Sequence, residues 1–389
     1  MVMTVDGKLR YVLTTNQHTH YNRLCHREYD ISVDTEEPQQ VLSFVPEKRR
    51  KSYLAEDEAE RSVASFTLGK GKADWGPLSV YAVMRSGDIY AICPYMPKNA
   101  AIPSSYVHAL ECFVAAKQEF LSQASTSDAA SANSSLTNMY DYQHKYVTAL
   151  LKQLPPGTAF PSKSRTVIMH PPATLRPQPV RQGPFLLQPA PLALENSEGG
   201  DATDIVYLTF GTENDENDEG ETERLGVVLV AFQDGKVDVF LDVEKVEARW
   251  ERKVCSWLWF HNAMTFHLHS TQHGTNAELP MLAVYETIDL GLVATLTRIS
   301  PTLTDSRALD LLQANHPVFL QDPIHDETVY IYHAFGVHAL QLGRLLQNLA
   351  NALRDDVSND DGRSLAISLE NAGATLVQPI LTTFSVESR

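Results

Sequence analysis

Cysteine is scarce in this chain of 389 residues. Its four cysteines, at positions 25, 93, 112 and 255, lie far apart and form no CxxC pair. No segment with a cationic start and an apolar core precedes them, as a secretory signal would. We therefore expect the chain to reside in a reduced compartment, cytosolic or nuclear.

Long apolar runs are also missing. The longest covers residues 225–232, and the next candidate, 280–299, is interrupted by Glu286, Asp289 and Arg298. A helix that spans a bilayer needs about 20 consecutive apolar residues. The sequence therefore predicts a soluble protein, or one that partners hold at a membrane.

Basic residues are in the minority, because 32 Lys and Arg face 48 Asp and Glu, a formal charge of −16. Seven of these acids lie between Glu213 and Glu223, and without them the balance is still −16 + 7 = −9. Such a charge argues against a surface that binds nucleic acid through its phosphates. We interpret residues 211–224 as a solvated acidic loop in preference to a tether for a basic partner.

Catalytic motifs are absent from the sequence. It contains no GxSxG elbow, HExxH, kinase loop or dinucleotide-binding fingerprint. The run Gly69-Lys70-Gly71-Lys72 lacks the spacing of a phosphate-binding loop and its strand-to-helix context. We therefore predict no catalytic residues, no cofactor-binding residues, no cofactor and no enzymatic activity.

Two polar clusters leave alternatives open. A zinc site, and with it a zinc-dependent hydrolase, is conceivable for four histidines within thirteen residues: His261, His267, His269 and His273. Zinc needs three or four convergent ligands with supporting contacts, and no cysteine or aligned carboxylate accompanies this run. We favour surface histidines and predict no metal site. The basic run 48–51 fits a nuclear-localisation patch, but a solvated loop is the commoner reading.

What the sequence does contain is a repeated strand hairpin. Apolar residues alternate with period two on both sides of short Gly/Asp turns, which is typical of antiparallel strands. Asp-Gly and Gly-Asp supply the positive φ that a tight turn needs. The pattern is clearest at residues 78–93 around Ser86-Gly87-Asp88 and at 225–241 around Gln233-Asp234-Gly235, and weaker at 3–12 and 328–340. Repeated hairpins suit the blades of a β-propeller, although a sandwich also uses them.

The segments between these hairpins predict insertions in a single domain over residues 1–389. Helical periodicity predicts an insertion over 104–154, with helices at 104–123 and 136–154 joined by a Ser/Ala/Asn linker at 124–135. Seven prolines between Pro171 and Pro191 favour extended or edge segments. A further amphipathic helix followed by an acidic loop is expected over 342–361, and a closing strand over 374–384.

Particular segments resemble the nucleoporin eighty-two/eighty-eight family of fungi. The first runs from Asp74-Trp-Gly-Pro through the Gly87-Asp88 turn and Cys93-Pro94 to Pro97. Further similar segments are 183–191, 204–208 and 225–250, so about a quarter of the chain carries the likeness. The hairpin residues have core roles, because alternate side chains such as Tyr81 and Val83 would pack between blades.

This resemblance implies a mainly β fold, a seven-bladed propeller with helical insertions, of which this chain would hold the C-terminal blades. It implies a scaffold at the cytoplasmic face of the nuclear pore complex that supports mRNA export and nucleocytoplasmic transport. The implied partners are other nucleoporins: the tail of a phenylalanine-glycine-repeat nucleoporin and the autoproteolytic domain of a GLFG nucleoporin. We expect a chain truncated at its N-terminus and lacking the family's C-terminal coiled coil.

The docking residues are not implied by the resemblance, and we name only the loop after Cys93 and residues 213–224 as candidates. A WD-like adaptor that binds peptides at the centre of a complete ring remains the alternative function.

Overall fold

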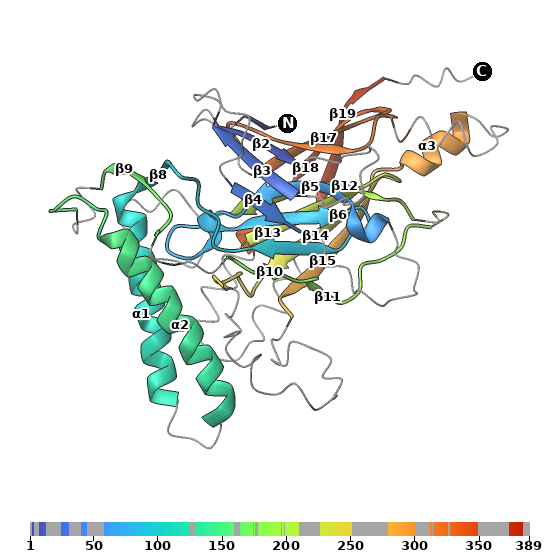
Figure 1. Cartoon of the computed structure of the whole chain (residues 1–389). Coiled ribbons are helices and arrows are strands. Elements are labelled where there is room, and N and C mark those ends of the chain that lie inside the picture. The colour runs from blue at the N-terminus through green and yellow to red at the C-terminus, as the bar shows by residue number, and fades with distance from the viewer. Residues whose placement is uncertain are drawn as a thin grey trace, which may run out of the picture.

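The structure is a computed structural model (Figure 1). Every structural statement below refers to the residues that it describes: 2–3, 8–12, 25–30, 40–44, 58–124, 130–158, 164–173, 175, 178–195, 197, 199–209, 226–250, 279–299, 312, 314–325, 327–348 and 373–383.

Four sheets, numbered here in chain order, contain most of the described strands. The first sheet has the order β1 (Val2–Met3), β2 (Lys8–Val12), β3 (Cys25–Asp30), β4 (Gln40–Ser43). The second has the order β10 (Arg181–Gln182), β7 (Ile89–Ile92), β6 (Val80–Met84), β5 (Val63–Leu68). The third has the order β11 (Leu186–Gln188), β15 (Met281–Asp289), β14 (Lys236–Asp242), β13 (Gly226–Phe232), β12 (Ala202–Thr209). The fourth has the order β16 (Val318–Gln321), β17 (Thr328–His333), β18 (Gly336–Gln341), β19 (Leu376–Thr382).

Helices and a small ribbon accompany these sheets in the described part of the chain. The ribbon pairs β8 (Ala100–Pro103) with β9 (Thr166–Met169), and the helices are α1 (Ser104–Ala124), α2 (Ala130–Leu151) and α3 (Leu292–Ile299). Short 3-10 turns lie at Ala59–Arg61 and Gly76–Leu78. Figure 1 shows α1 and α2 extending together away from the sheets. None of the helices in the described part of the chain combines the length and the apolar character that crossing a bilayer needs.

The predicted hairpins are confirmed. β6 and β7 flank the turn at Gly87, whose φ is +94°, and β13 and β14 flank Gly235, whose φ is +90°. The hairpin expected at 328–340 is β17 with β18, and that at 3–12 is β1 with β2. A β-carbon at these positive φ values is strained, which is why glycine occupies the turns.

The sheets stack in series and do not form a two-layer sandwich. Every residue of β6 and of β13 is buried, so the second and third sheets are covered on both faces. Alternate residues of β6 pack in two different cores. Val80 and Ala82 share one core with Leu42 on β4 of the first sheet, whereas Tyr81 packs in the core that includes residues of the third sheet. Edge strands of neighbouring sheets, β5 with β12 and β12 with β16, are in contact. This is the arrangement of propeller blades, and the described sheets do not close into a ring.

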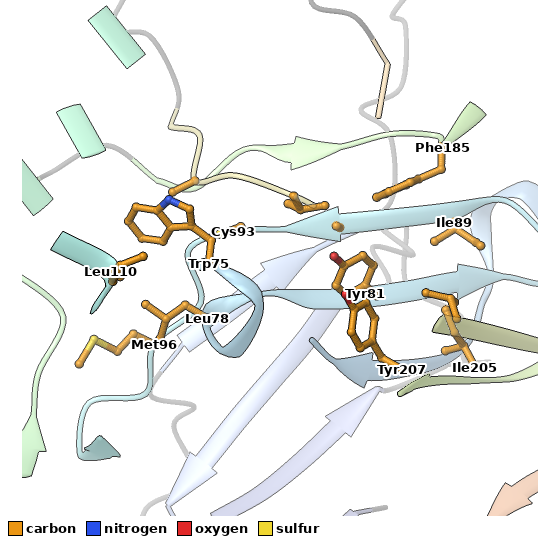
Figure 2. Close-up of a cluster of buried hydrophobic side chains, with 14 of the residues drawn as sticks. Trp75, Leu78, Tyr81, Ile89, Cys93, Met96, Leu110, Phe185, Ile205 and Tyr207 are labelled. Atoms are coloured by element: carbon orange, nitrogen blue, oxygen red, sulfur yellow. The ribbon is translucent and has the colours of Figure 1, made fainter. Parts of the chain in front are cut away.

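The largest core lies between the second and third sheets and beneath the helices (Figure 2). Tyr81 and Ile89 come from the second sheet, Ile205 and Tyr207 from the third, and Leu110 from α1. A second core joins the third and fourth sheets and includes Leu229, Val239, Ile331 and Leu340. The alternation predicted for the hairpins therefore supplies packing between blades.

Two helices lie in the segment predicted as a helical insertion, and one predicted boundary differs from the structure. The helical insertion at 104–154 is present as α1 and α2, but α2 already begins at Ala130, so the expected linker at 124–135 is too long. Alanine has the highest helix propensity, and the helix starts on an Ala-Ser-Ala run within the predicted linker.

The proline-rich segment runs along sheet edges, as predicted. Within residues 171–191, β10 and β11 form the outermost strands of the second and third sheets. At the other end of the chain, residues 343–348 are helical and β19 is the expected closing strand. The rest of the segment 342–361 lies outside the described residues, as does the acidic loop at 211–224.

Candidate interaction surfaces

One buried carboxylate connects three successive sheets. Asp204 lies at a register shift in β12, and its Oδ1 accepts the hydroxyl of Ser65 on β5 at 2.6 Å. Its Oδ2 accepts the backbone N–H of Phe319 on β16 at 2.8 Å. Burial raises the pKa of Asp204, while these hydrogen bonds act in the opposite direction. The contact fixes how the edge strands β5, β12 and β16 of the three sheets are aligned.

A second carboxylate bonds two tyrosines inside the largest core. Asp242, at the end of β14, is 1% exposed, and its Oδ2 accepts the hydroxyls of Tyr207 at 2.6 Å and Tyr81 at 3.1 Å. Its Oδ1 has no hydrogen-bond partner among the described atoms. Burial raises the pKa of Asp242. These bonds satisfy the phenol groups in an otherwise apolar layer.

The Asp74-Trp-Gly-Pro segment carries the strongest part of the family likeness, and it joins the sheets to the helices. Trp75 is fully buried and donates its indole N–H to Oε1 of Gln143 on α2 at 3.2 Å. The carboxylate of Asp74 accepts the backbone N–H of Gly76 at 2.9 Å and pairs with Lys245 at 2.5 Å. Its backbone carbonyl accepts the hydroxyl of Tyr106 on α1 at 2.8 Å. The segment is therefore a structural junction.

Gly69-Lys70-Gly71-Lys72 packs against the same junction. A β-carbon on Gly71 would lie 2.1 Å from Oδ1 of Asp74, and one on Gly69 would lie 2.5 Å from the carbonyl oxygen of Gly76. Lys70 donates to Oε1 of Gln321 on β16 at 3.1 Å. These glycines allow close packing of a turn after β5.

Of the two loops predicted to dock partners, the one after Cys93 is mostly inaccessible. Residues 94–97 are buried, and only Lys98 and Asn99 are exposed before β8 begins. Met96 contacts the hydroxyl of Tyr146 on α2 through its sulfur at 3.8 Å. Apart from two residues, this loop is core, because it runs beneath the helices. The other candidate loop, 213–224, lies outside the described residues.

The remaining sequence clusters also lie outside the described residues. These are the histidines His261, His267, His269 and His273 and the basic run 48–51. Within the part of the chain that the structure describes, no three His, Cys, Asp or Glu side chains are grouped as a metal site would require.

Two exposed apolar surfaces were not anticipated from the sequence. The distal part of the α1–α2 hairpin exposes Phe120 (69%) and Leu136 (41%). The face of the fourth sheet that points away from the third exposes Leu320, Tyr332, Leu376 and Leu381, by 47% to 58%. Apolar surface of this kind is frequent where proteins bind one another. Strand alternation in the fourth sheet is the signal that could have revealed the second surface.

Comparison with known proteins agrees with this architecture. The family model described as Nucleoporin NUP82 beta-propeller matches residues 32–384. The chain is 26% identical over 201 residues to nucleoporin nup82 of Schizosaccharomyces pombe, which is 48% of this chain and 22% of that protein. It is 22% identical over 210 residues to nucleoporin NUP82 of Chaetomium thermophilum, which is 50% of this chain and 23% of that protein. The chain thus spans less than a quarter of the length of these relatives.

Solved structures are similar over most of the chain. One is the heterotrimeric complex of the Nup82 NTD, the Nup159 TAIL and the Nup145N APD of Chaetomium thermophilum. It aligns with a TM-score of 0.65 at 18% identity, over 94% of this chain and 64% of that one. The yeast heterotrimeric Nup82-Nup159-Nup116 complex aligns with a TM-score of 0.54 at 14% identity, over 92% and 62%. At these identities the likeness concerns the fold. The family model covers most of the sequence, and the chain therefore belongs to the Nucleoporin NUP82 beta-propeller family.

Proposed function

We propose that this chain is a non-enzymatic scaffold of the nuclear pore complex that docks other nucleoporins at its cytoplasmic face. The observation that carries the proposal is the family match over residues 32–384, together with blades stacked in series. The scaffold would support mRNA export and nucleocytoplasmic transport.

The proposed partners follow from the complexes in which the structural relatives occur. These contain a Nup159 tail together with the APD of Nup145N, or Nup159 together with Nup116. By analogy, this chain would bind the tail of a phenylalanine-glycine-repeat nucleoporin and the autoproteolytic domain of a GLFG nucleoporin. A scaffold built from buried strands offers its insertions and loops for such contacts.

The buried polar groups support a structural role. Asp204 and Asp242 are each occupied by hydrogen bonds from neighbouring strands, and Cys93 is buried with its pKa raised by desolvation. A nucleophile or general base needs access to a substrate and a pKa suited to its task. These groups instead hold the sheets together.

Titration calorimetry tests the proposal. The purified chain is titrated separately with a Nup159 tail fragment and with an APD fragment of Nup145N, taken from the same organism as the chain. Saturable binding of either fragment supports the scaffold. No heat change with either fragment, from a chain that melts cooperatively, contradicts it. Elemental analysis of the same sample distinguishes the zinc hydrolase, because bound zinc would favour that alternative.

A further inference from the structure

The α1–α2 hairpin has a half anchored at the sheets and a distal half. Near the sheets, Val107, Leu110 and Val114 of α1 are fully buried in the largest core. Farther out, Phe120 is 69% exposed and Leu136 of α2 is 41% exposed. The two helices extend beyond the sheets as one arm (Figure 1).

A single carboxylate contacts both helices where they leave the core. Glu247 follows β14, and its Oε1 accepts the hydroxyl of Tyr140 on α2 at 3.2 Å and lies 3.7 Å from Nζ of Lys117 on α1. Its Oε2 accepts Nε2 of Gln143 on α2 at 3.4 Å. Lys117 lies one turn beyond Val114, the last fully buried residue of α1, so Glu247 lies at the base of the distal half.

The segment that carries Glu247 is itself fixed to the second sheet. The backbone N–H of Arg249 donates to the carbonyl of Cys93 at 3.0 Å, and Nε2 of Gln182 on β10 donates to the carbonyl of Glu247 at 2.8 Å. Gln143 also donates to the carbonyl of Ala248 at 3.1 Å. The carboxylate therefore belongs to a rigid support and not to a loose loop.

We infer that Glu247 is a positioning residue, which fixes the angle at which the distal half of the α1–α2 hairpin leaves the sheets. Hydrogen bonds to a charged group are stronger than neutral ones, and Glu247 is largely shielded from water. Seven residues of α1 lie beyond Lys117, which at 1.5 Å per residue is about 10 Å. A small rotation at Glu247 therefore displaces the exposed tip. This inference goes beyond the proposed function, because it concerns the arm whatever partner binds.

Distances between spin labels test this inference directly. One label is placed at Gln123 near the arm tip and one at Ser86 in the exposed β6–β7 turn, each introduced as cysteine. Of the native cysteines, only buried Cys93 is retained, and the other three are replaced by serine.

The parent protein should give one narrow distance distribution by electron double resonance. Glu247→Ala should broaden or shift it, and Glu247→Gln, which keeps an acceptor but loses the charge, should fall between the two. Asp141→Ala is the matched control. It removes only the bond from Gln118 to Asp141 between the helices, 3.0 Å long, and should leave the distribution unchanged.

An unchanged distribution in a folded Glu247→Ala protein overturns the inference, because the aromatic packing of Trp75 and Tyr146 would then set the angle. Equal broadening by Asp141→Ala overturns it too. If Glu247→Ala does not fold, the double variant Tyr140→Phe and Lys117→Ala removes two contacts of Glu247, and it must broaden the distribution for the inference to stand. Partner binding is not part of this measurement, so its outcome leaves the proposed function untouched.

Discussion

Replacing Gly235 by alanine tests the packing of the β13–β14 turn against α3. Gly235 has φ +90°, and a β-carbon there would lie 2.5 Å from Cγ of Leu292 and 2.9 Å from its Cβ and Cδ1. The left-handed conformation costs an alanine about 1–2 kcal/mol. Overpacking a tight core site costs about 1–3 kcal/mol more. We therefore expect Gly235→Ala to lower the free energy of unfolding by about 2–5 kcal/mol.

Gly157 provides a matched control. Its φ is +85°, but a β-carbon there would meet nothing within 4 Å. Gly157→Ala should therefore carry only the conformational cost, about 1–2 kcal/mol. Urea unfolding, followed by tryptophan fluorescence and by circular dichroism, measures the free energy of unfolding of both variants. The dependence of this free energy on urea concentration should be the same in both.

The clash can also be relieved from the other side. Leu292 is 1% exposed, and Leu292→Ala by itself should destabilise the protein by leaving a cavity. In the double variant Gly235→Ala and Leu292→Ala, the free energy of unfolding should fall by less than the sum of the two single losses. The shortened side chain at position 292 no longer meets the new methyl group. Equal costs for Gly235→Ala and Gly157→Ala, or strict additivity in the double variant, would refute the packing of α3 on this turn.

Three further changes probe other contacts. Gly87→Val should lower the melting temperature, because φ is +94° and a β-carbon would lie 3.2 Å from Phe232; an unchanged melting curve would contradict the β6–β7 turn. Asp242→Ala leaves the buried hydroxyls of Tyr81 and Tyr207 without an acceptor and should lower the free energy of unfolding, measured with urea, by about 2–4 kcal/mol. Asp242→Asn keeps an acceptor and should lower it by less. Equal losses in the two variants would count against these hydrogen bonds. Nε2 of His333 lies 2.7 Å from Nδ1 of His338, within hydrogen-bond distance, and burial lowers the pKa of His333 to about 4. Because the unfolded chain then binds the proton more tightly than the folded chain, the stability should fall as the pH drops from about 6.5 towards 4. His333→Asn should reduce this pH dependence, as measured by melting curves at several pH values. An unaltered pH dependence would refute the lowered pKa of His333.

The hairpins were predictable because their signals are local. The turns at Gly87 and Gly235 are flanked by alternating apolar residues, and both the strand type and the inward faces follow from that period. The missed elements have weaker local signals. α3 has only eight residues, and β15 reads as a nearly continuous apolar run without a tight turn before it.

The contacts that hold the sheets together were not predictable from the sequence. Asp204 bonds to residues 139 and 115 positions away in the chain, and nothing beside it marks it as the link between three strands. Glu247 likewise looks like a surface acid in an ordinary charged segment. Long-range pairing of this kind becomes visible only when the sheets are stacked.

Light scattering coupled to size exclusion tests the central claim most directly, because it weighs the complex that the scaffold is proposed to assemble. The chain is mixed with the Nup159 tail fragment and the Nup145N APD fragment together. We expect one peak whose mass equals the sum of the three polypeptides. Three separate peaks, from a chain that elutes as a folded protein, would contradict the account.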